Sequence, residues 1–311
     1  MKIGFFGTPE ISRYCLDKLL EEFEISFVVT AEDKPAGRRR KIYQSPVKEV
    51  AIGKGITVFQ PSDLNDDSLI DEFKLKDADI FVVVAYGRII PPNIYNIPKF
   101  KTINLHPSLL PKYRGAAPVQ WALLNGEIET GVTVQIINAD LDAGDILLQE
   151  SVAIDRDMTS EELYDIILPL GANLLKDAIE LLVVNKARPV KQDDNEATYC
   201  KKIDKENSCI NWERPSKTIH NLIRGLNPKP VACSNFRGKK VKIWKTRLVD
   251  DCSFSRIEPG YFKIIKGRMP LVATIDGYLE IIQIQPEGKK VMDGISFVNG
   301  YRLVDEDHFS N

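Results

Sequence analysis

The feature that most constrains this chain is the run 78–84, which is apolar almost without interruption. Such a strand has no polar face to present to water, so it must be buried on both sides of a sheet. The opening agrees, because an apolar strand at 2–6, an amphipathic helix at 11–22 and a second strand at 25–29 follow one another. We therefore predict an α/β fold with a Rossmann-like, mostly parallel sheet. The first turn has only Gly7 and lacks the dinucleotide-binding fingerprint.

The last third of the chain has a different sequence pattern. Short alternating strands at 241–245, 271–275 and 279–284 are separated by glycines, a pattern typical of a small β-barrel of the OB-like kind. The chain has 311 residues, more than a single core usually organises. We predict a first domain at 1–189, a linker at 190–207 and a C-terminal β-barrel at 208–311.

Composition limits the possible classes of protein. The net charge is −2 and 43% of residues are apolar, which is typical of a globular protein and argues against nucleic-acid binding by bulk charge alone. The sequence has no apolar run long enough for a membrane span. Five scattered cysteines suit a reducing compartment, and three unclustered histidines make a zinc site improbable. We expect a cytoplasmic, monomeric protein without a metal.

Two polar motifs follow predicted strands. Asn104 and His106 come at the end of the strand that begins at Thr102, and Asp142 follows the strand 132–137. Residues past the carboxyl ends of strands line the ligand crevice of an open α/β sheet, so we expect these three to meet there. Taken singly, each of these residues more often forms part of a turn or of ordinary packing than part of a functional site. Together, an amide and an imidazole that polarise a carbonyl, and a carboxylate that orients the imidazole, suit direct acyl transfer.

The segment 33–41 is longer and more basic than a connection between elements requires. A solvated run of charge explains it as well as an arm that grips phosphates through its guanidinium groups. The first half of the predicted barrel is also basic, which fits either a nucleic-acid surface or an ordinary soluble one. Further along, Thr159 and Glu162 form a capping box that begins a long helix, and Pro169 should kink that helix.

Nine short motifs resemble those of a known family. They are Phe6-Gly-Thr-Pro9, Pro35-Ala-Gly-Arg38, Val84-Ala-Tyr-Gly87, Asn104-Leu-His-Pro-Ser-Leu-Leu-Pro111, Tyr113-Arg-Gly-Ala-Ala-Pro118, Glu129-Thr-Gly-Val-Thr133, Leu141-Asp-Ala-Gly-Asp145, Asn227-Pro228 and Gly288-Lys-Lys290. Along essentially its whole length the chain resembles the methionyl-tRNA formyltransferases. The central motifs are also similar to those of other 10-formyltetrahydrofolate transformylases, so they indicate the chemistry, and the motifs around them favour the tRNA acceptor.

The resemblance implies transfer of a formyl group from 10-formyltetrahydrofolate to the α-amine of initiator methionyl-tRNA, without a metal. Asn104 and His106 would stabilise the oxyanion, and Asp142 would hold His106 with an ordered water. We expect the folate against Ala85, Tyr86, Gly87, Arg88, Ile89, Ser108, Leu109, Leu110 and Pro111. On the tRNA side we expect Arg38, Arg39, Arg40 and Lys41, with Gly7, Thr8 and Pro9 toward the acceptor.

Two residues depart from the pattern of the family, namely Arg39 in place of a Gly and Lys229 in place of an aromatic residue. They bear on loop flexibility and on one local packing contact. The nearest alternative is a UDP-amino-sugar formyltransferase with the same three catalytic residues. A 10-formyltetrahydrofolate hydrolase and a non-enzymatic RNA-binding protein are the others, and the intact trio argues against the last.

Overall fold

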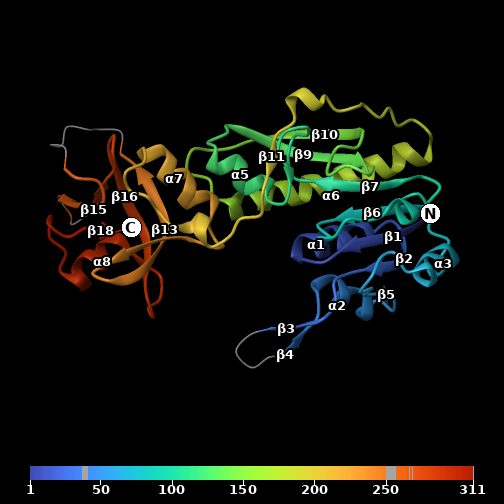
Figure 1. The fold of residues 1–311 in the computed structure, drawn as a ribbon, viewed down its shortest axis with the longest axis horizontal. Coiled ribbons are helices and arrows are strands. Elements are labelled where there is room, and N and C mark those ends of the chain that lie inside the picture. The colour runs from blue at the N-terminus through green and yellow to red at the C-terminus, as the bar shows by residue number, and fades with distance from the viewer. Residues whose placement is uncertain (37–40, 250–256, 266, 268, 311) are drawn as a thin grey trace. The chain divides into compact units, whose positions relative to one another are not determined.

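The computed structural model describes residues 1–36, 41–249, 257–265, 267 and 269–310 (Figure 1). It divides into two compact units. The N-terminal unit comprises Met1–Gly115, Gly131–Val152 and Asp165–Tyr199. The C-terminal unit comprises Ala116–Thr130, Ala153–Tyr164 and, within its described residues, Cys200–Asn311.

A seven-stranded sheet in the order β10-β9-β7-β6-β1-β2-β5 forms the centre of the N-terminal unit. Its strands are β1 (Lys2–Gly7), β2 (Glu24–Val29), β5 (Thr57–Phe59), β6 (Ile80–Val84), β7 (Thr102–His106), β9 (Glu129–Ile136) and β10 (Ile146–Ala153). The pairs β1–β2, β1–β6, β2–β5 and β6–β7 are parallel, whereas β7–β9 is antiparallel. The predicted mostly parallel α/β sheet is confirmed, and β6 is buried along its whole length.

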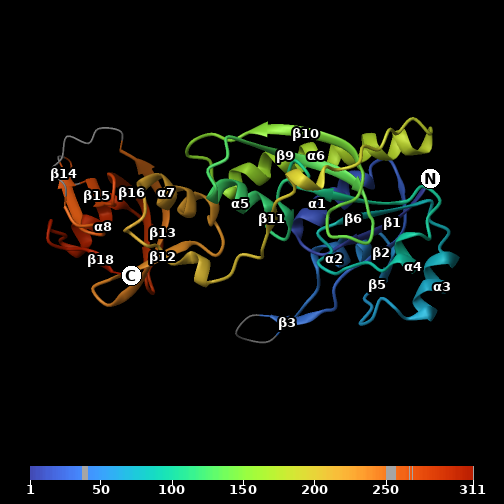
Figure 2. The same cartoon turned by 45° about the horizontal axis from the view of Figure 1, so that its top comes forward.

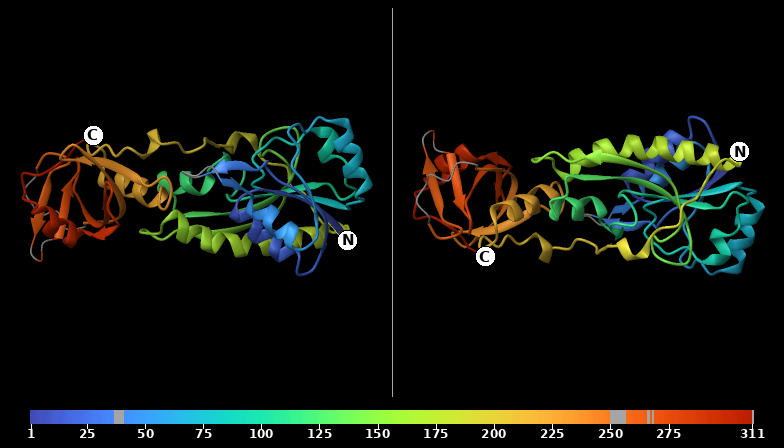
Figure 3. Two further views of the ribbon diagram at one scale, coloured as in Figure 1. Left: turned by 90° about the horizontal axis from the view of Figure 1, so that it is seen from below. Right: turned by 90° about the horizontal axis from the view of Figure 1, so that it is seen from above.

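Helices and short elements connect these strands. They are α1 (Glu10–Leu19), α2 (Pro46–Gly53), α3 (Asp67–Leu75), α4 (Pro92–Tyr95), α6 (Ser160–Val183), the 3₁₀ turn Asp194–Glu196, and the short strands β3 (Lys34–Ala36), β4 (Lys41–Tyr43) and β8 (Arg114–Gly115). The part of α6 in this unit lies along the sheet (Figure 3). A Cβ on Gly171 of α6 would lie 2.9 Å from Leu105 of β7, so glycine permits this close approach.

Aromatic side chains fill the core under β1, β2 and β6. Phe6 lies edge-on to Phe27, Phe73 and Tyr86, and Phe27 stacks on Phe73 with ring centroids 5.0 Å apart. Edge-to-face and offset pairs add about 0.5–1.5 kcal/mol each beyond area burial. This cluster fixes β1 beside β6, and so the relative positions of the loops that follow these two strands.

The predicted capping box at the start of α6 is confirmed. The Thr159 main-chain N–H donates to Glu162 Oε2 at 2.7 Å, and the Glu162 N–H donates to Thr159 Oγ1 at 3.3 Å. The hydrogen bond from the Thr159 main-chain N–H lowers the pKa of the Glu162 carboxyl below its ordinary value. Pro169 lies within α6, which continues past it to Val183.

We expect Thr159→Ala to lower the free energy of unfolding by about 0.5–2 kcal/mol, because it removes the side-chain acceptor for a helix N-terminal N–H. Urea denaturation followed by circular dichroism measures this. The matched control is Glu161→Ala, since Glu161 is an exposed neighbour in the same turn. Equal losses in the two variants would contradict the capping role.

Antiparallel strands in the order β14-β15-β16-β13-β12-β18 form the C-terminal unit, with β17 paired to β16. The elements are α5 (Pro118–Leu124), the 3₁₀ turn Glu206–Ser208, α7 (Ser216–Gly225), β12 (Ala232–Phe236), β13 (Lys239–Leu248), β14 (Phe262–Ile265), β15 (Met269–Ala273), β16 (Tyr278–Pro286), β17 (Met292–Asp293), α8 (Gly294–Tyr301) and β18 (Phe309–Ser310). The short strand β11 (Tyr199–Cys200), which begins in the N-terminal unit, pairs with β8. Helix α7 packs beside β13 (Figure 2).

This sheet curls until its two edges meet. The Phe262 N–H donates to Asp307 O at 3.0 Å, the Phe309 N–H donates to Gly260 O at 2.9 Å, and Tyr261 and His308 form a bridge between the edges. Trp212, Phe236 and Phe309 lie in the core inside the curl. The predicted small β-barrel domain is confirmed. Among the residues that the structure describes, no helix is both long enough and apolar enough to cross a membrane.

Candidate active site

Four polar side chains share one face of the N-terminal sheet. Asn104 and His106 of β7 lie opposite Gln135 and Thr133 of β9, respectively. Directly opposed residues of an antiparallel pair project to the same face. Leu105, which lies between the two β7 residues and projects to the other face, contacts α6. The first two predicted catalytic residues therefore project to the face away from α6.

Asp142 reaches this face by a different route from the one expected. The prediction requires both strands to end at the same edge of the sheet, but β9 is antiparallel to β7, and Ile136 pairs with Ile103 near the start of β7. The chain after β9 turns back, and the Ile136 N–H donates to Asp145 O at 2.9 Å. The Asp142 carboxylate accepts from the Gly115 N–H at 2.9 Å and from Gln135 Nε2 at 3.1 Å. The turn thus returns Asp142 to His106.

Gly144 makes this return possible. A Cβ at position 144 would lie 1.6 Å from Ile136 O, so any side chain there would push the turn off β9. The Gly144 N–H also donates to Gln135 Oε1 at 3.2 Å. The close approach explains why glycine follows Asp142-Ala143 in the motif.

Both ring nitrogens of His106 face acceptors. Nε2 lies 2.9 Å from the main-chain oxygen of Tyr113, and Nδ1 lies 3.6 Å from Asp142 Oδ1. A carbonyl oxygen only accepts, so Nε2 carries a hydrogen in this arrangement. The longer distance exceeds a direct hydrogen bond. With the ring 4% exposed, the carboxylate acts on the imidazole chiefly as a nearby charge.

Three non-glycine residues around the site have left-handed backbone conformations. They are Ala85 with φ 45°, Tyr113 with φ 60° and Asp142 with φ 51°. This conformation costs side-chain-bearing residues free energy and is held only by surrounding contacts. Such residues cluster at ligand-binding and catalytic sites, so their gathering here supports the assignment of the site.

The loop after β6 offers main chain rather than side chains to a ligand. Tyr86 is 4% exposed and packs its ring on Phe6, and burial raises the pKa of its phenol. Arg88 turns toward the loop before α3 and donates to Pro61 O at 2.6 Å and Ser62 O at 2.9 Å. Gly87 has φ 82° with open space beside it, and Ile89 is 84% exposed. In this region, therefore, Ala85, Gly87 and Ile89 remain available for contact.

The loop after β7 is held from the neighbouring strands. Thr133 Oγ1 donates to Ser108 O at 2.6 Å and accepts from the Leu110 N–H at 3.2 Å. Gln149 Nε2 donates to Leu110 O at 2.7 Å. Leu110 is buried, whereas Leu109 and Pro111 are half-buried. These contacts fix the four residues 108–111 beside the face that bears Asn104 and His106.

The turn 7–9 adjoins the loop after β6. Thr8 Oγ1 donates to Tyr86 O at 3.4 Å and accepts from the Ala31 N–H at 3.3 Å. Ser12 Oγ donates to Val84 O at 2.5 Å, which ties the start of α1 to the end of β6. Gly7 and Pro9 flank Thr8 in this turn. Of the predicted tRNA-side residues, Arg38, Arg39 and Arg40 lie outside the described residues, and Lys41 begins β4.

Three residues that contact the turn of Asp142 or support it are not among the predicted site residues. Gln135 binds the carboxylate, and Gln192 Nε2 donates to Asp142 O at 2.9 Å and Gly144 O at 2.7 Å. Arg114, 2% exposed, donates to Gln192 Oε1 through Nε at 3.1 Å and Nη2 at 2.9 Å. Burial tends to lower the pKa of the Arg114 guanidinium, but hydrogen bonds with Asp194 and Tyr199 outweigh burial and raise it. The sequence signals for two of these three residues are the polar Gln inside the strand 132–137 and the place of Arg114 in the motif Tyr113-Arg-Gly-Ala-Ala-Pro118.

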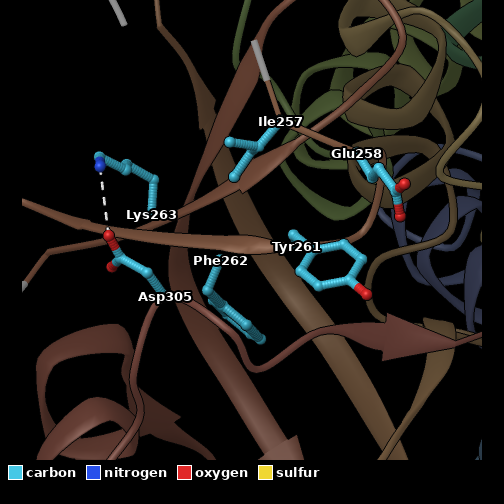
Figure 4. A pocket seen from close by; sticks show the side chains of 6 residues that line it. All are labelled: Ile257, Glu258, Tyr261, Phe262, Lys263 and Asp305. Carbon is cyan, nitrogen blue, oxygen red and sulfur yellow. Dashed lines mark hydrogen bonds and ion pairs between the residues drawn. The ribbon is translucent and has the colours of Figure 1, made fainter. Parts of the chain in front are cut away.

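A separate cavity of about 430 Å³ lies in the C-terminal unit (Figure 4). Its lining includes Tyr261, Phe262 and Glu258, and Lys263 pairs with Asp305 at 3.2 Å. The lining brings together no amide, imidazole and carboxylate of the kind found on the N-terminal sheet. Within the described ranges, no group of three or more His, Cys, Asp or Glu side chains is arranged to hold a metal.

Solved structures with this fold include several formyltransferases. An N-formyltransferase from Helicobacter canadensis, in complex with folinic acid and dTDP-3-aminofucose, has a TM-score of 0.69 at 24% identity, covering 90% of this chain and 98% of its own. WlaRD, a sugar 3N-formyl transferase, has a TM-score of 0.68 at 23% identity, covering 93% and 99%. At these identities the likeness establishes the fold.

Sequence comparison is more specific. The formyl transferase family matches residues 1–179, and the formyl transferase C-terminal domain matches residues 202–302. Methionyl-tRNA formyltransferase from Clostridium novyi is 42% identical over 96% of this chain and 97% of its own length. That from Fusobacterium nucleatum is 41% identical over 96% and 97%, and that from Clostridium acetobutylicum is 43% identical over 97% of each. The chain therefore belongs to the formyl transferase family and, within it, to the methionyl-tRNA formyltransferases.

Proposed function

We propose that this protein transfers the formyl group of 10-formyltetrahydrofolate to the α-amine of methionyl-tRNA. The observation that carries the proposal is the arrangement of His106, which lies between Tyr113 O and the Asp142 carboxylate on the face that also bears Asn104. Full-length relatives named for this reaction support the choice of acceptor.

In the proposed mechanism, the amine attacks the formyl carbon directly and forms a tetrahedral oxyanion. Asn104 Nδ2 and the imidazole of His106 stabilise this charge, and one such donor is typically worth about 10²–10³ in rate. His106 Nε2 is bonded to Tyr113 O in the structure. Substrate binding must therefore exchange this carbonyl for the formyl oxygen.

Asp142 has two roles in this mechanism. Its carboxylate lies 3.6 Å from His106 Nδ1 and so helps to hold the imidazole that faces the oxyanion. It also accepts the proton that the attacking amine loses and helps return it to the leaving nitrogen as the intermediate collapses. The chain needs no covalent intermediate, because the amine is itself the nucleophile.

The donor fits the loops that adjoin this face. We propose that the main chain of 85–89 and 108–111 reads the pterin and that Leu109 and Leu110 contribute apolar walls. Support comes from the positive φ of Ala85 and Gly87 and from the hydrogen bonds that hold the loop after β7. The turn 7–9 then faces the acceptor.

We further propose that residues 1–189 form the catalytic domain, 190–207 the linker and 208–311 a barrel that contacts the tRNA backbone. The arm at Arg38–Lys41 would grip the acceptor stem of initiator tRNA. The protein would act as a cytoplasmic monomer. Support for the arm is its run of three arginines and a lysine, which suits phosphate binding by charge-assisted hydrogen bonds.

The test of the proposed function is product formation by the purified protein. With 10-formyltetrahydrofolate and methionine-charged initiator tRNA, mild alkaline release of the amino acid should yield N-formylmethionine. Release of methionine alone, after incubation with intact donor and a charged tRNA that a known transformylase accepts, would contradict the proposal.

We expect Arg38→Ala to raise the KM for methionyl-tRNA on the order of 10-fold, because a charge-assisted contact contributes about 1.5–3 kcal/mol. It should also reduce the slope of log(kcat/KM) against log[salt] by about one. The KM for the folate donor should not change. Arg13→Ala is the matched control, because Arg13 pairs with Glu10 on α1. An equal rise in both KM values would contradict a specific role in tRNA binding.

A further inference from the structure

The orientation of the Gln135 amide can be read from its partners. Its Oε1 lies 3.2 Å from the Gly144 N–H, which only donates, so the oxygen must face Gly144. Its Nε2 then faces Asp142 Oδ1 at 3.1 Å. Because each end of the amide meets a group of fixed polarity, a reversed amide would place two donors against each other and two acceptors against each other.

Gln192 is oriented in the same way from the other side. Its Oε1 accepts two hydrogen bonds from the buried guanidinium of Arg114, so its Nε2 must face the turn, where it donates to Asp142 O and Gly144 O. The Gln192 Nε2 also lies 3.3 Å from Gln135 Oε1. Arg114 thus sets the direction of Gln192, and Gln192 holds the turn against Gln135.

The two partners of the Arg114–Asp194 ion pair differ in their exposure to solvent. Its side chain is 3% exposed, whereas its carboxylate partner Asp194, 2.8 Å away, is 74% exposed. Burying a guanidinium against an exposed carboxylate is weak support for stability, since desolvation offsets most of the attraction. A guanidinium only donates hydrogen bonds, so Arg114 can face only the oxygen of the Gln192 amide and thereby fixes the orientation of that amide.

We propose that Gln135 is a positioning residue for the formyl transfer, and that Arg114 and Gln192 keep it oriented. The inference rests on the proposed role of Asp142. The Gln135 amide and the Gly115 N–H occupy one oxygen each of the carboxylate, so they fix its rotation and its distance from His106 without adding charge. The left-handed backbone of Asp142, with φ 51°, is held by the same contacts.

Two variants and one control test the inference with the full-length protein. Gln135→Leu removes the donor and should lower kcat about 10–100-fold at unchanged KM for methionyl-tRNA, because small displacements of a catalytic group are costly. In an Asp142→Asn background the same substitution should cause little further loss, since Gln135 acts through that carboxylate. An undiminished loss in that background would overturn the inference.

Gln135→Glu keeps the shape and adds a titratable group. At low pH its protonated carboxyl donates to Asp142 as the amide does. As pH rises, two neighbouring carboxylates form and repel each other. The ratio of variant to wild-type kcat should therefore fall with rising pH, which a merely structural defect would not produce. This isosteric variant carries the test if Gln135→Leu does not fold.

Gln60→Glu is the matched control. Gln60 Nε2 donates to Asp33 Oδ1 at 2.8 Å, an amide-to-carboxylate contact in the same unit, just after the edge strand β5. Lys48 Nζ binds both of these side chains. The kcat ratio of Gln60→Glu should stay near one at every pH. The positioning role alone would be overturned if both Gln135 variants had wild-type kcat, with a ratio of variant to wild-type kcat that does not change with pH, while Asp142→Asn was inactive. Wild-type protein that does not formylate methionyl-tRNA would overturn the proposed function together with it.

Discussion

We expect Asp142→Asn to lower kcat by about 10²–10⁴-fold, the usual contribution of a group that moves a proton in the transition state. The substitution removes the charge beside His106 Nδ1. It also presents an amide with one acceptor to two donors, Gly115 N–H and Gln135 Nε2. Single-turnover formylation of methionyl-tRNA, with both substrates saturating, isolates the chemical step from product release.

The control for this substitution is Asp140→Asn, which changes an exposed carboxylate in the same turn. It should leave kcat within about twofold of the wild type, since an exposed charge is strongly screened. Comparable losses in the two variants would mean that the turn, rather than the Asp142 carboxylate, carries the effect. Retention of wild-type kcat by Asp142→Asn would remove Asp142 from the mechanism.

His106→Ala has the second large effect. We expect kcat to fall at least about 10²–10³-fold, because the variant lacks a donor for the oxyanion. The KM for the folate donor should change little, since main chain and apolar walls hold the donor in the proposed arrangement. Initial rates at varied donor concentration separate the two quantities.

His220→Ala is the matched control for His106→Ala. His220 is 2% exposed and its Nε2 lies 3.1 Å from the main-chain oxygen of Arg156, much as His106 Nε2 lies against Tyr113 O. Burial also lowers the pKa of His220, so its loss tests the removal of a buried, predominantly neutral imidazole. Similar losses of thermal stability in both variants, with loss of kcat only in His106→Ala, would separate catalysis from folding.

Much of the fold could be predicted because its determinants are local or compositional. The two-sided apolar run at 78–84 required a buried strand, and β6 is that strand. The Thr159–Glu162 box is a contact three residues apart, so the sequence contains both partners. The glycine-punctuated strands predicted a small barrel, although its closure depends on contacts between residues 260–262 and 307–309, which no local pattern reveals.

The geometry of the site could be predicted only in part. Asn104, His106 and Asp142 were chosen for their chemistry, but the direction of β9 is set by long-range pairing with β7. The hydrogen-bond network behind Asp142 joins residues 114, 135 and 192. The orientation of the two Gln amides in it depends on which end of each amide faces a hydrogen-bond donor. Sequence spacing contains no such information. Gly144 was visible in the motif, but the reason for it, the Ile136 carbonyl, was not.

The most direct test of the account is a comparison of acceptors at matched ionic strength. The protein would be incubated with 10-formyltetrahydrofolate and methionine-charged initiator tRNA, with a UDP-amino-sugar, or with no acceptor. We predict rapid formylation of the charged tRNA, with no formylated sugar and only background loss of donor. Transfer to the sugar, or release of formate without an acceptor, would contradict the account, because either would mean that Asn104, His106 and Asp142 act on a different substrate.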